Sequence, residues 1–128
     1  MKPTLIDTDI LSGFFRNTPS VIENVQEYLK NYDFLNISII TYYEILNGLL
    51  YKDAQKQLQK FKEFARQNKV VPLTIRAANI AAEIYADLRK KGKPIGHTDC
   101  LIAGIALANN LQRSTNNTEH LIGLITLN

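Results

Sequence analysis

Short apolar runs alternate along the chain with longer segments in which apolar residues recur at helical spacing. The apolar runs lie at residues 4–7, 35–40 and 70–73, and each is short enough to be a buried strand. The longer segments predict helices at about residues 8–16, 19–31, 41–50, 53–67, 75–91 and 98–109. Strands that alternate with helices indicate crossover connections and a parallel sheet. We therefore expect a three-layer α/β/α domain with a central, mostly parallel sheet.

Local signals mark the ends and the inner faces of these helices. Thr8 or Asp9 is placed to cap the first helix, and Pro19 suits the first position of the second. Gly92 is placed to end the helix at 75–91. The second helix carries an apolar face made of Val21, Ile22, Val25, Tyr28 and Leu29.

The last part of the chain is harder to assign. Residues 111–115 and 121–127 suggest two further strands. Gln112 and Arg113 nevertheless fit poorly in a sheet that helices cover on both faces, because such strands are usually apolar throughout. The pattern leaves open whether the chain forms a strand here.

Length and composition bound the class of protein. The 128 residues suit one domain, residues 1–128, of ordinary size. No apolar run approaches the roughly 20 residues of a membrane span, and the N-terminus lacks the layout of a signal peptide. We therefore expect a soluble, cytoplasmic protein with no membrane contact. The single cysteine, Cys100, lies in an apolar stretch, which predicts a buried and inert thiol.

A mild basic excess permits a polyanionic partner. The formal net charge is +3 and the isoelectric point is about 9.0. The basic stretch at residues 89–93 leads into the turn before Asp99, where it is placed to meet a nucleic-acid backbone; a charged helix end explains it equally well. For His97, packing of the turn is at least as good an explanation as substrate contact. The candidate substrate-binding residues are Arg16, Arg89, Lys90, Lys91, Lys93 and His97.

Three acidic residues stand at strand ends or in first turns of helices, namely Asp7, Glu44 and Asp99. Each has a structural explanation: Glu44 follows Thr41 at capping-box spacing, and the other two suit helix N-termini. In a parallel sheet, however, all three would meet at the carboxyl edge of the strands, where ligands bind. Three carboxylates there would repel one another unless a cation bound them. Oxygen ligands favour a hard ion, Mg²⁺ or Mn²⁺.

Four segments in this order resemble the PIN-domain ribonucleases, and in particular the VapC toxins of toxin-antitoxin pairs. They are LIDTDIL, SIITYYEILNGL, ADLRKKGKPIGHTDCLIAGIAL and STNNTEHL, and together they extend over nearly the whole chain. The resemblance implies a metal-dependent endoribonuclease whose metal-binding acids are Asp7, Glu44 and Asp99. It places the fourth catalytic position on Asn117. Because an amide brings no charge, we expect one well-bound ion.

The same resemblance implies supporting residues and partners. Asp9 would orient Asp7 through hydrogen bonds, and Thr115 would bond a ligating carboxylate or a substrate phosphate. His120 is more simply explained as a surface group than as a catalytic one. The implied substrate is RNA, with tRNA as a typical target. The implied partners are a small cognate antitoxin, which would form a heteromer with the toxin, and a second copy in a homodimer.

Two other functions stay open at this point. A DNA nuclease or phosphatase of similar α/β build would use the same carboxylates. A catalytically weak or inactive PIN-like module would act mainly by binding an antitoxin, and the amide at Asn117 and the irregular segment 111–115 motivate that alternative.

Overall fold

Leu5 and Ile6 are neighbours in the first strand, and their side chains enter cores on opposite faces of the sheet. Leu5 packs with Ile102 and Ile105 of the helix at His97–Ala108, whereas Ile6 packs in a separate core that contains Phe61. Successive strand residues alternate between the two faces, so a strand that is apolar on both sides must be covered on both. The three-layer arrangement expected from the sequence is therefore confirmed.

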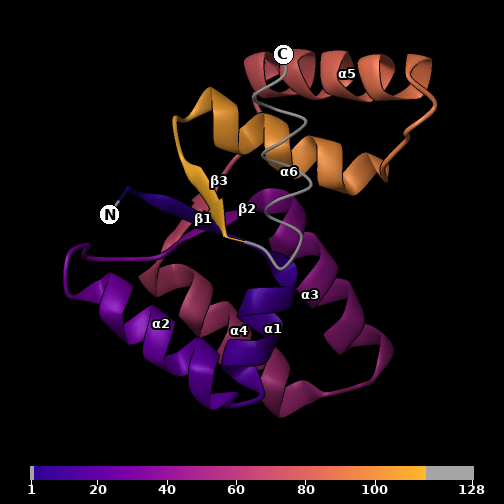
Figure 1. Cartoon of the computed structure of the whole chain (residues 1–128). Helices are drawn as coiled ribbons and strands as arrows, with labels where there is room; N and C mark the ends of the chain where they lie inside the picture. The colour runs from indigo at the N-terminus through magenta and orange to yellow at the C-terminus, as the bar shows by residue number, and fades with distance from the viewer. Residues whose placement is uncertain (1, 115–128) are drawn as a thin grey trace.

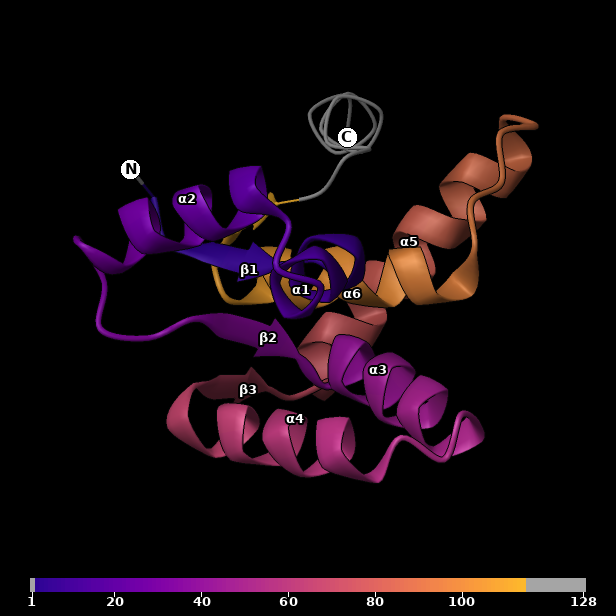
Figure 2. The same ribbon diagram turned by 90° about the horizontal axis from the view of Figure 1, so that it is seen from below.

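The computed structural model describes residues 2–114. Helices α1 to α4 cover one face of the sheet and α5 and α6 cover the other (Figures 1 and 2). The described elements are β1 (Thr4–Ile6), α1 (Thr8–Phe15), α2 (Pro19–Leu29), β2 (Asn36–Ser38), α3 (Ile39–Tyr51), α4 (Gln55–Gln67), β3 (Lys69–Val71), α5 (Ile75–Lys90), α6 (His97–Ala108) and β4 (Gln112–Ser114).

The four described strands form one parallel sheet in the order β3-β2-β1-β4. Strand β1 lies inside the sheet, with Leu5 paired to Asn36 of β2 and to Arg113 of β4. The amide of Asp7 continues this pairing by donating to the Ser114 carbonyl at 3.0 Å. All four strands point the same way, so their carboxyl ends share one edge of the sheet.

Two strands end earlier than the apolar pattern predicted. Residues 35–40 were expected to be a strand, but Ser38 is the N-cap of α3, and Ile39 and Ile40 are helical. The Ser38 hydroxyl accepts a 2.9 Å hydrogen bond from the Thr41 amide, which fixes the start of the helix. The third strand ends at Val71 because the next residue is a proline, which has no amide hydrogen for the ladder.

Strand β4 does form, and it contains Arg113 with a buried side chain. The strand suggested at 111–115 is therefore confirmed for Gln112–Ser114, and the objection that Gln112 and Arg113 fit poorly in the sheet does not hold. Gln112 is exposed, while Arg113 is accommodated because carboxylates bind its guanidinium. The second suggested strand, at residues 121–127, lies outside the described residues.

The predicted helix signals are largely confirmed. Pro19 stands at the start of α2, and Gly92, with a φ of +70°, follows the end of α5. Val25 and Tyr28 of α2 are buried in the core, but Leu29 is 41% exposed, so its assignment to the inner face was wrong. Neither Thr8 nor Asp9 is the cap of α1; Asp7 holds that position.

Helices α5 and α6 pack unusually closely. At Gly104, an added Cβ would overlap the Ala77 carbonyl oxygen and approach the Ala81 Cβ at 2.9 Å. This contact brings α6 against α5, and α6 carries Asp99 in its first turn. None of the described helices is long and apolar enough to cross a membrane.

Candidate metal-dependent active site

The three predicted acids lie where the carboxyl edge of the sheet meets the helices. Asp7 follows β1 directly, Glu44 lies in α3 after β2, and Asp99 lies in the first turn of α6. Asp7 has a side chain that is 8% exposed, whereas that of Asp99 is 52% exposed. The edge therefore presents one deep carboxylate and one that water reaches freely.

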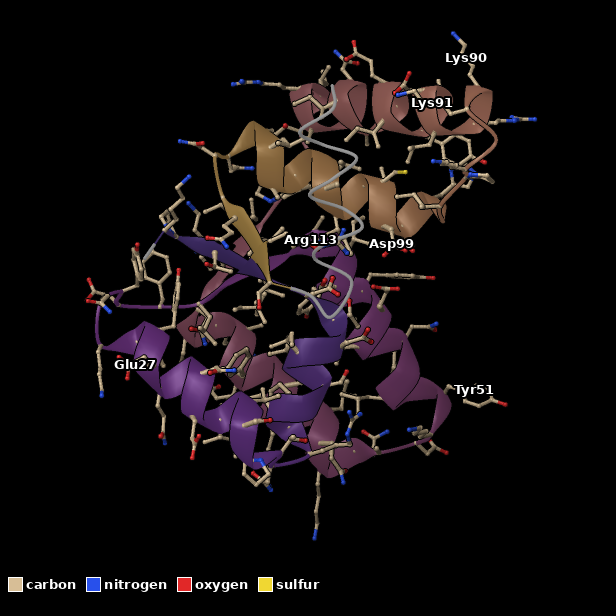
Figure 3. All side chains as sticks on the ribbon, viewed as in Figure 1. Glu27, Tyr51, Lys90, Lys91, Asp99 and Arg113 are labelled. Atoms are coloured by element: carbon tan, nitrogen blue, oxygen red, sulfur yellow. The ribbon has the colours of Figure 1, made fainter. Side chains whose placement is uncertain are left out.

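Arg113 joins two of these acids. Its Nη2 donates to Asp7 Oδ1 at 2.8 Å and to Asp99 Oδ1 at 3.3 Å, and its Nη1 donates to the Asp99 backbone carbonyl at 3.2 Å. In Figure 3 the labelled Arg113 and Asp99 lie next to each other, between β4 and the start of α6. Asp7 and Asp99 are thus converged on a single cationic group, although they are far apart in the sequence.

Glu44 is held by a different contact. Thr8 Oγ1 donates to Glu44 Oε1 at 2.7 Å and shares a 3.0 Å hydrogen bond with Thr41 Oγ1. Since Thr8 directly follows Asp7, these bonds tie α3 to the end of β1. Glu44 is therefore brought to the same edge through Thr8 and has no bond to the Arg113 guanidinium.

The structural explanations for two of the acids can now be judged. Asp7 is the N-cap of α1, but its carboxylate makes no capping hydrogen bond and is bound by Arg113 instead. Glu44 does not complete a capping box with Thr41, because the helix already begins at Ile39. Capping therefore does not account for Asp7 or Glu44, whereas Asp99 does stand in a first turn, where the helix dipole favours an acid.

The donor chemistry of Asp7 and Asp99 fits a hard divalent cation. Both offer carboxylate oxygens, and both already bind the same positive group. Within residues 2–114, no group of three or more Asp, Glu, His or Cys side chains is close enough to hold a metal ion. The arrangement therefore presents two candidate ligands, Asp7 and Asp99. Glu44 is bonded to Thr8, the residue after Asp7. Asn117, Thr115 and His120 lie outside the described residues.

Asp9 and His97 differ in how the structure accounts for them. Asp9 is exposed and has no hydrogen-bond partner among the described residues, so its orienting role stays a prediction. His97 stacks on Tyr85, with ring centroids 4.1 Å apart and an interplanar angle of 18°. This stacking supports the packing explanation for His97, because it fixes the turn from α5 into α6.

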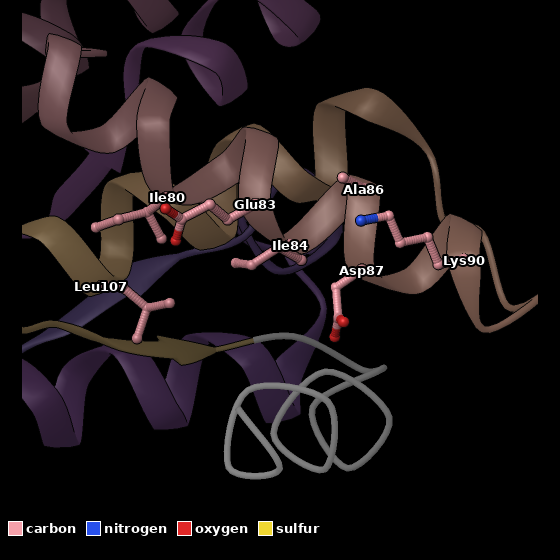
Figure 4. Close-up of a pocket in the computed structure, with 7 residues that line it drawn as sticks. All are labelled: Ile80, Glu83, Ile84, Ala86, Asp87, Lys90 and Leu107. Atoms are coloured by element: carbon pink, nitrogen blue, oxygen red, sulfur yellow. The ribbon is translucent and has the colours of Figure 1, made fainter.

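The basic residues at the end of α5 are exposed. Lys91 forms a 3.0 Å ion pair with Asp87, one turn earlier, and Lys90 points away from Asp99 (Figure 3). Lys90 also lines a hollow of about 450 Å³ between α5 and α6, with Glu83, Ile84 and Leu107 among the other lining residues (Figure 4). None of the predicted metal acids lines this hollow.

Arg16 lies on a second hollow, of about 440 Å³, at α1, α3 and α4. Its apolar lining includes Phe15, Leu49 and Phe61, and its other basic residues are Lys52 and Lys60. The hollow therefore combines apolar and basic side chains, and the substrate contact of Arg16 stays a prediction.

Cys100 is 2% exposed and free, as expected. Burial raises the pKa of its thiol, the Asp99 charge raises it further, and the Arg113 charge opposes this. A thiol that resists ionisation is a poor nucleophile, which supports the prediction that Cys100 is inert.

Sequence reasoning missed two of the residues that organise this edge. Thr8 was considered only as a helix cap, and Arg113 only as an obstacle to a strand. The signal for Arg113 was present: an arginine in a buried strand needs a carboxylate partner, and Asp7 ends a strand of the same sheet.

The fold and the site can be compared with known proteins. The PIN domain family model matches residues 4–121, and the chain therefore belongs to the PIN-domain family. Divalent-metal dependence is general among PIN-domain ribonucleases.

Within that family the chain is similar to the VapC proteins. It is 31% identical over 117 residues to Ribonuclease VapC1 of Haemophilus influenzae strain R2866, covering 90% of this chain and 87% of that protein. It is 28% identical over 120 residues to the tRNA(fMet)-specific endonuclease VapC of Shigella flexneri, covering 93% and 89%. The crystal structure of DNA-bound VapBC from Salmonella typhimurium contains a chain with a TM-score of 0.80 and 30% identity, covering 91% and 88%.

Proposed function

We propose that this protein is a Mg²⁺- or Mn²⁺-dependent endoribonuclease and acts in the cytoplasm as the toxin of a VapBC-type toxin-antitoxin pair. The observation that carries the proposal is the convergence of Asp7 and Asp99 on one cationic group at the carboxyl edge of the sheet. Similarity to VapC ribonucleases over nine-tenths of the chain supports RNA as the substrate class, and the Shigella relative supports tRNA.

Each proposed site residue has its own role. Asp7 and Asp99 would hold the cation, with Glu44 as the third carboxylate and Asn117 positioning a water. A bound divalent cation supplies polarisation of the scissile phosphate and a lowered pKa for the attacking water. Thr8 holds Glu44 in place, and Asp9 would support Asp7. No side chain needs to act as a covalent nucleophile.

A positively charged approach surface is proposed for the RNA backbone. Arg89, Lys90, Lys91 and Lys93 lie at or just after the end of α5, in the segment that leads to Asp99. Phosphate contacts of this kind position a nucleic acid without reading its sequence.

The cognate antitoxin and a second copy of the chain are the proposed protein partners. The Salmonella relative was crystallised as a VapBC complex with DNA, which supports a small antitoxin as partner. We assign the antitoxin to the hollow that contains Arg16, Lys52 and Lys60, because an apolar surface with basic side chains suits an amphipathic acidic segment. A short neighbouring reading frame for a DNA-binding antitoxin would support this role, and light scattering would test the proposed homodimer.

Substrate incubation tests the activity. The protein is incubated with tRNA, single-stranded DNA or a small phosphoester, each with Mg²⁺, Mn²⁺ or EDTA. We expect cleavage of tRNA with either metal, none with EDTA, and loss of cleavage in Asp99→Asn. Preferential turnover of DNA or the phosphoester would favour the alternative enzyme classes. Intact RNA under both metals, with antitoxin binding retained, would favour a binding module.

A further inference from the structure

The guanidinium of Arg113 contacts both Asp7 and Asp99, the two carboxylates that are proposed to hold the cation. One nitrogen, Nη2, contacts a carboxylate oxygen of each acid, at 2.8 and 3.3 Å. We propose that Arg113 is the resting counter-ion of this site, and that a divalent cation binds the two carboxylates by displacing the guanidinium. The inference rests on the proposed function, since it concerns the cation that the nuclease reaction uses.

The contact with Arg113 compensates the negative charge that the fold buries at Asp7. Asp7 is buried at the end of β1, and an isolated buried carboxylate is strongly disfavoured. Arg113 brings a positive charge to it across the β1–β4 pairing, with a side chain that is 5% exposed. The Asp7–Arg113 ion pair compensates the buried charge, and this allows the site to stay folded without a metal ion. The same contact occupies the carboxylate oxygens that would bind the metal.

The guanidinium nevertheless fits the site incompletely. Arginine binds a carboxylate best with two parallel N–H bonds, but here Nη2 alone serves both Asp7 and Asp99, and the second distance is long for a charge-assisted bond. Among residues 2–114, the buried Nε has no hydrogen-bond partner. A buried donor without a partner costs free energy, so Arg113 is a replaceable occupant of this site.

The fold itself does not require an arginine at this position. Arg113 pairs in register with Leu5, which is fully buried among apolar side chains on the α5–α6 side of the sheet. A leucine at position 113 would suit the same surroundings. The arginine is therefore explained by the carboxylates it meets and not by the strand.

A divalent cation can reach the site and would bind the two carboxylates more strongly than the guanidinium does. The Asp99 side chain is half exposed, so an ion from solvent meets this carboxylate first. Two positive charges neutralise both Asp7 and Asp99, whereas one guanidinium leaves a net negative charge on the pair. A hard ion also uses carboxylate oxygens as ligands directly.

The direct test follows the Arg113 Nε–H signal of the wild-type protein by NMR during a titration with Mg²⁺. The signal is assigned by its absence in Arg113→Lys. We expect saturating Mg²⁺ to shift this signal and speed its exchange with water, because the side chain leaves its buried position. A signal that stays unchanged while Mg²⁺ saturates the protein would overturn the proposal, since the guanidinium and the ion would then bind together.

Metal affinity provides the second test. Mn²⁺ binding is measured by electron paramagnetic resonance for wild type, Arg113→Leu and the control Arg76→Leu, which makes the same change at an exposed position of α5. We expect Arg113→Leu to bind Mn²⁺ on the order of tenfold more tightly, because the ion no longer has to displace a hydrogen bond between charged groups. Its metal-free melting temperature should fall, and the rise in melting temperature on adding Mn²⁺ should exceed that of wild type. Arg76→Leu should match wild type in all three.

The outcomes separate this inference from the proposed function. Equal or weaker Mn²⁺ binding by folded Arg113→Leu would overturn the displacement model, even if RNA cleavage with Mg²⁺ is intact. If Arg113→Leu does not fold, the wild-type titration decides alone. If neither metal binds the wild-type protein, the displacement proposal fails, and RNA cleavage that persists in EDTA would show that the nuclease activity itself survives without metal.

Discussion

Thr8 donates a 2.7 Å hydrogen bond to Glu44, and this bond links the first residue of α1 to α3. The Thr41 hydroxyl, 3.0 Å from that of Thr8, adds a second contact between the two helices. This bond holds the Glu44 carboxylate at the sheet edge. Thr8 therefore positions a proposed metal ligand without being one itself.

Replacing Thr8 by valine keeps the volume and removes the hydroxyl. We expect Thr8→Val to lower RNA cleavage and Mn²⁺ affinity roughly tenfold, as for lost supporting bonds at metal sites. The free energy of unfolding should fall by about 1 kcal/mol. Thr8→Ser restores the donor and should recover most of the metal affinity. Wild-type Mn²⁺ binding in Thr8→Val would mean that Glu44 does not depend on this bond.

The two aspartates of the first motif should respond differently to the same change. Asp7→Asn removes the buried partner of Arg113 and should abolish metal binding, with a loss of about 3 kcal/mol in stability. Asp9→Asn alters an exposed side chain without a described partner, so its stability should match wild type and its activity should fall only modestly. Chemical denaturation and Mn²⁺ titration of both variants measure the contrast. Equal losses at the two positions would contradict it.

The contrast between Asp7 and Arg113 shows what the sequence does and does not predict. Asp7 and Asp99 were predictable, because strand ends and helix starts place side chains at one edge whatever the detailed packing. The role of Arg113 was missed, since the local pattern alone makes a charged residue in a strand look like a break, and only a carboxylate elsewhere in the same sheet explains it. Its burial depends on a carboxylate 106 positions earlier in the chain, and such pairs follow from the tertiary fold.

The ends of β2 illustrate the same limit at short range. Ile39 and Ile40 continue the apolar run of the strand, and nothing in their hydrophobicity separates strand from helix. The Ser38 side chain makes the difference by capping the helix, and this shift of two residues also removes the capping-box role of Glu44. A serine followed three residues later by a threonine was a weaker signal than a six-residue run with four apolar side chains.

Two glycines in helices should give opposite results when changed to alanine. At Gly104 the added methyl group would overlap α5, and we expect a loss of roughly 1–3 kcal/mol in the free energy of unfolding. At Gly48 in α3 nothing lies within 4 Å of the added Cβ, and the better helix propensity of alanine should give a gain of about 0.5–1 kcal/mol. Urea denaturation compares the two. A neutral Gly104→Ala would show that α5 and α6 can separate freely.

The Cys100 thiol should resist modification while the protein is folded. Burial raises its pKa, so the thiolate that reacts with iodoacetamide is scarce near neutral pH. The sign of the linkage follows: the unfolded thiol ionises at lower pH than the folded one, so this group contributes less stability as the pH rises past its unfolded pKa. Mass spectrometry should find labelling only in denaturant, and rapid labelling of the native protein would contradict the buried position.

The basic end of α5 should contribute to RNA affinity through charge alone. Lys90→Gln with Lys91→Gln should weaken binding of uncleavable RNA and lower the slope of log affinity against log salt by about 1.5, as expected for two lost phosphate contacts. The matched control changes Lys30 and Lys69. In each pair one lysine is already in an exposed ion pair, Lys91 with Asp87 and Lys30 with Glu27, and Glu27 lies on the opposite side of the molecule from Lys90 (Figure 3). If the control pair lowers the slope as much, RNA affinity depends on net charge and not on this surface. If neither pair lowers the slope, the RNA backbone binds elsewhere on the protein.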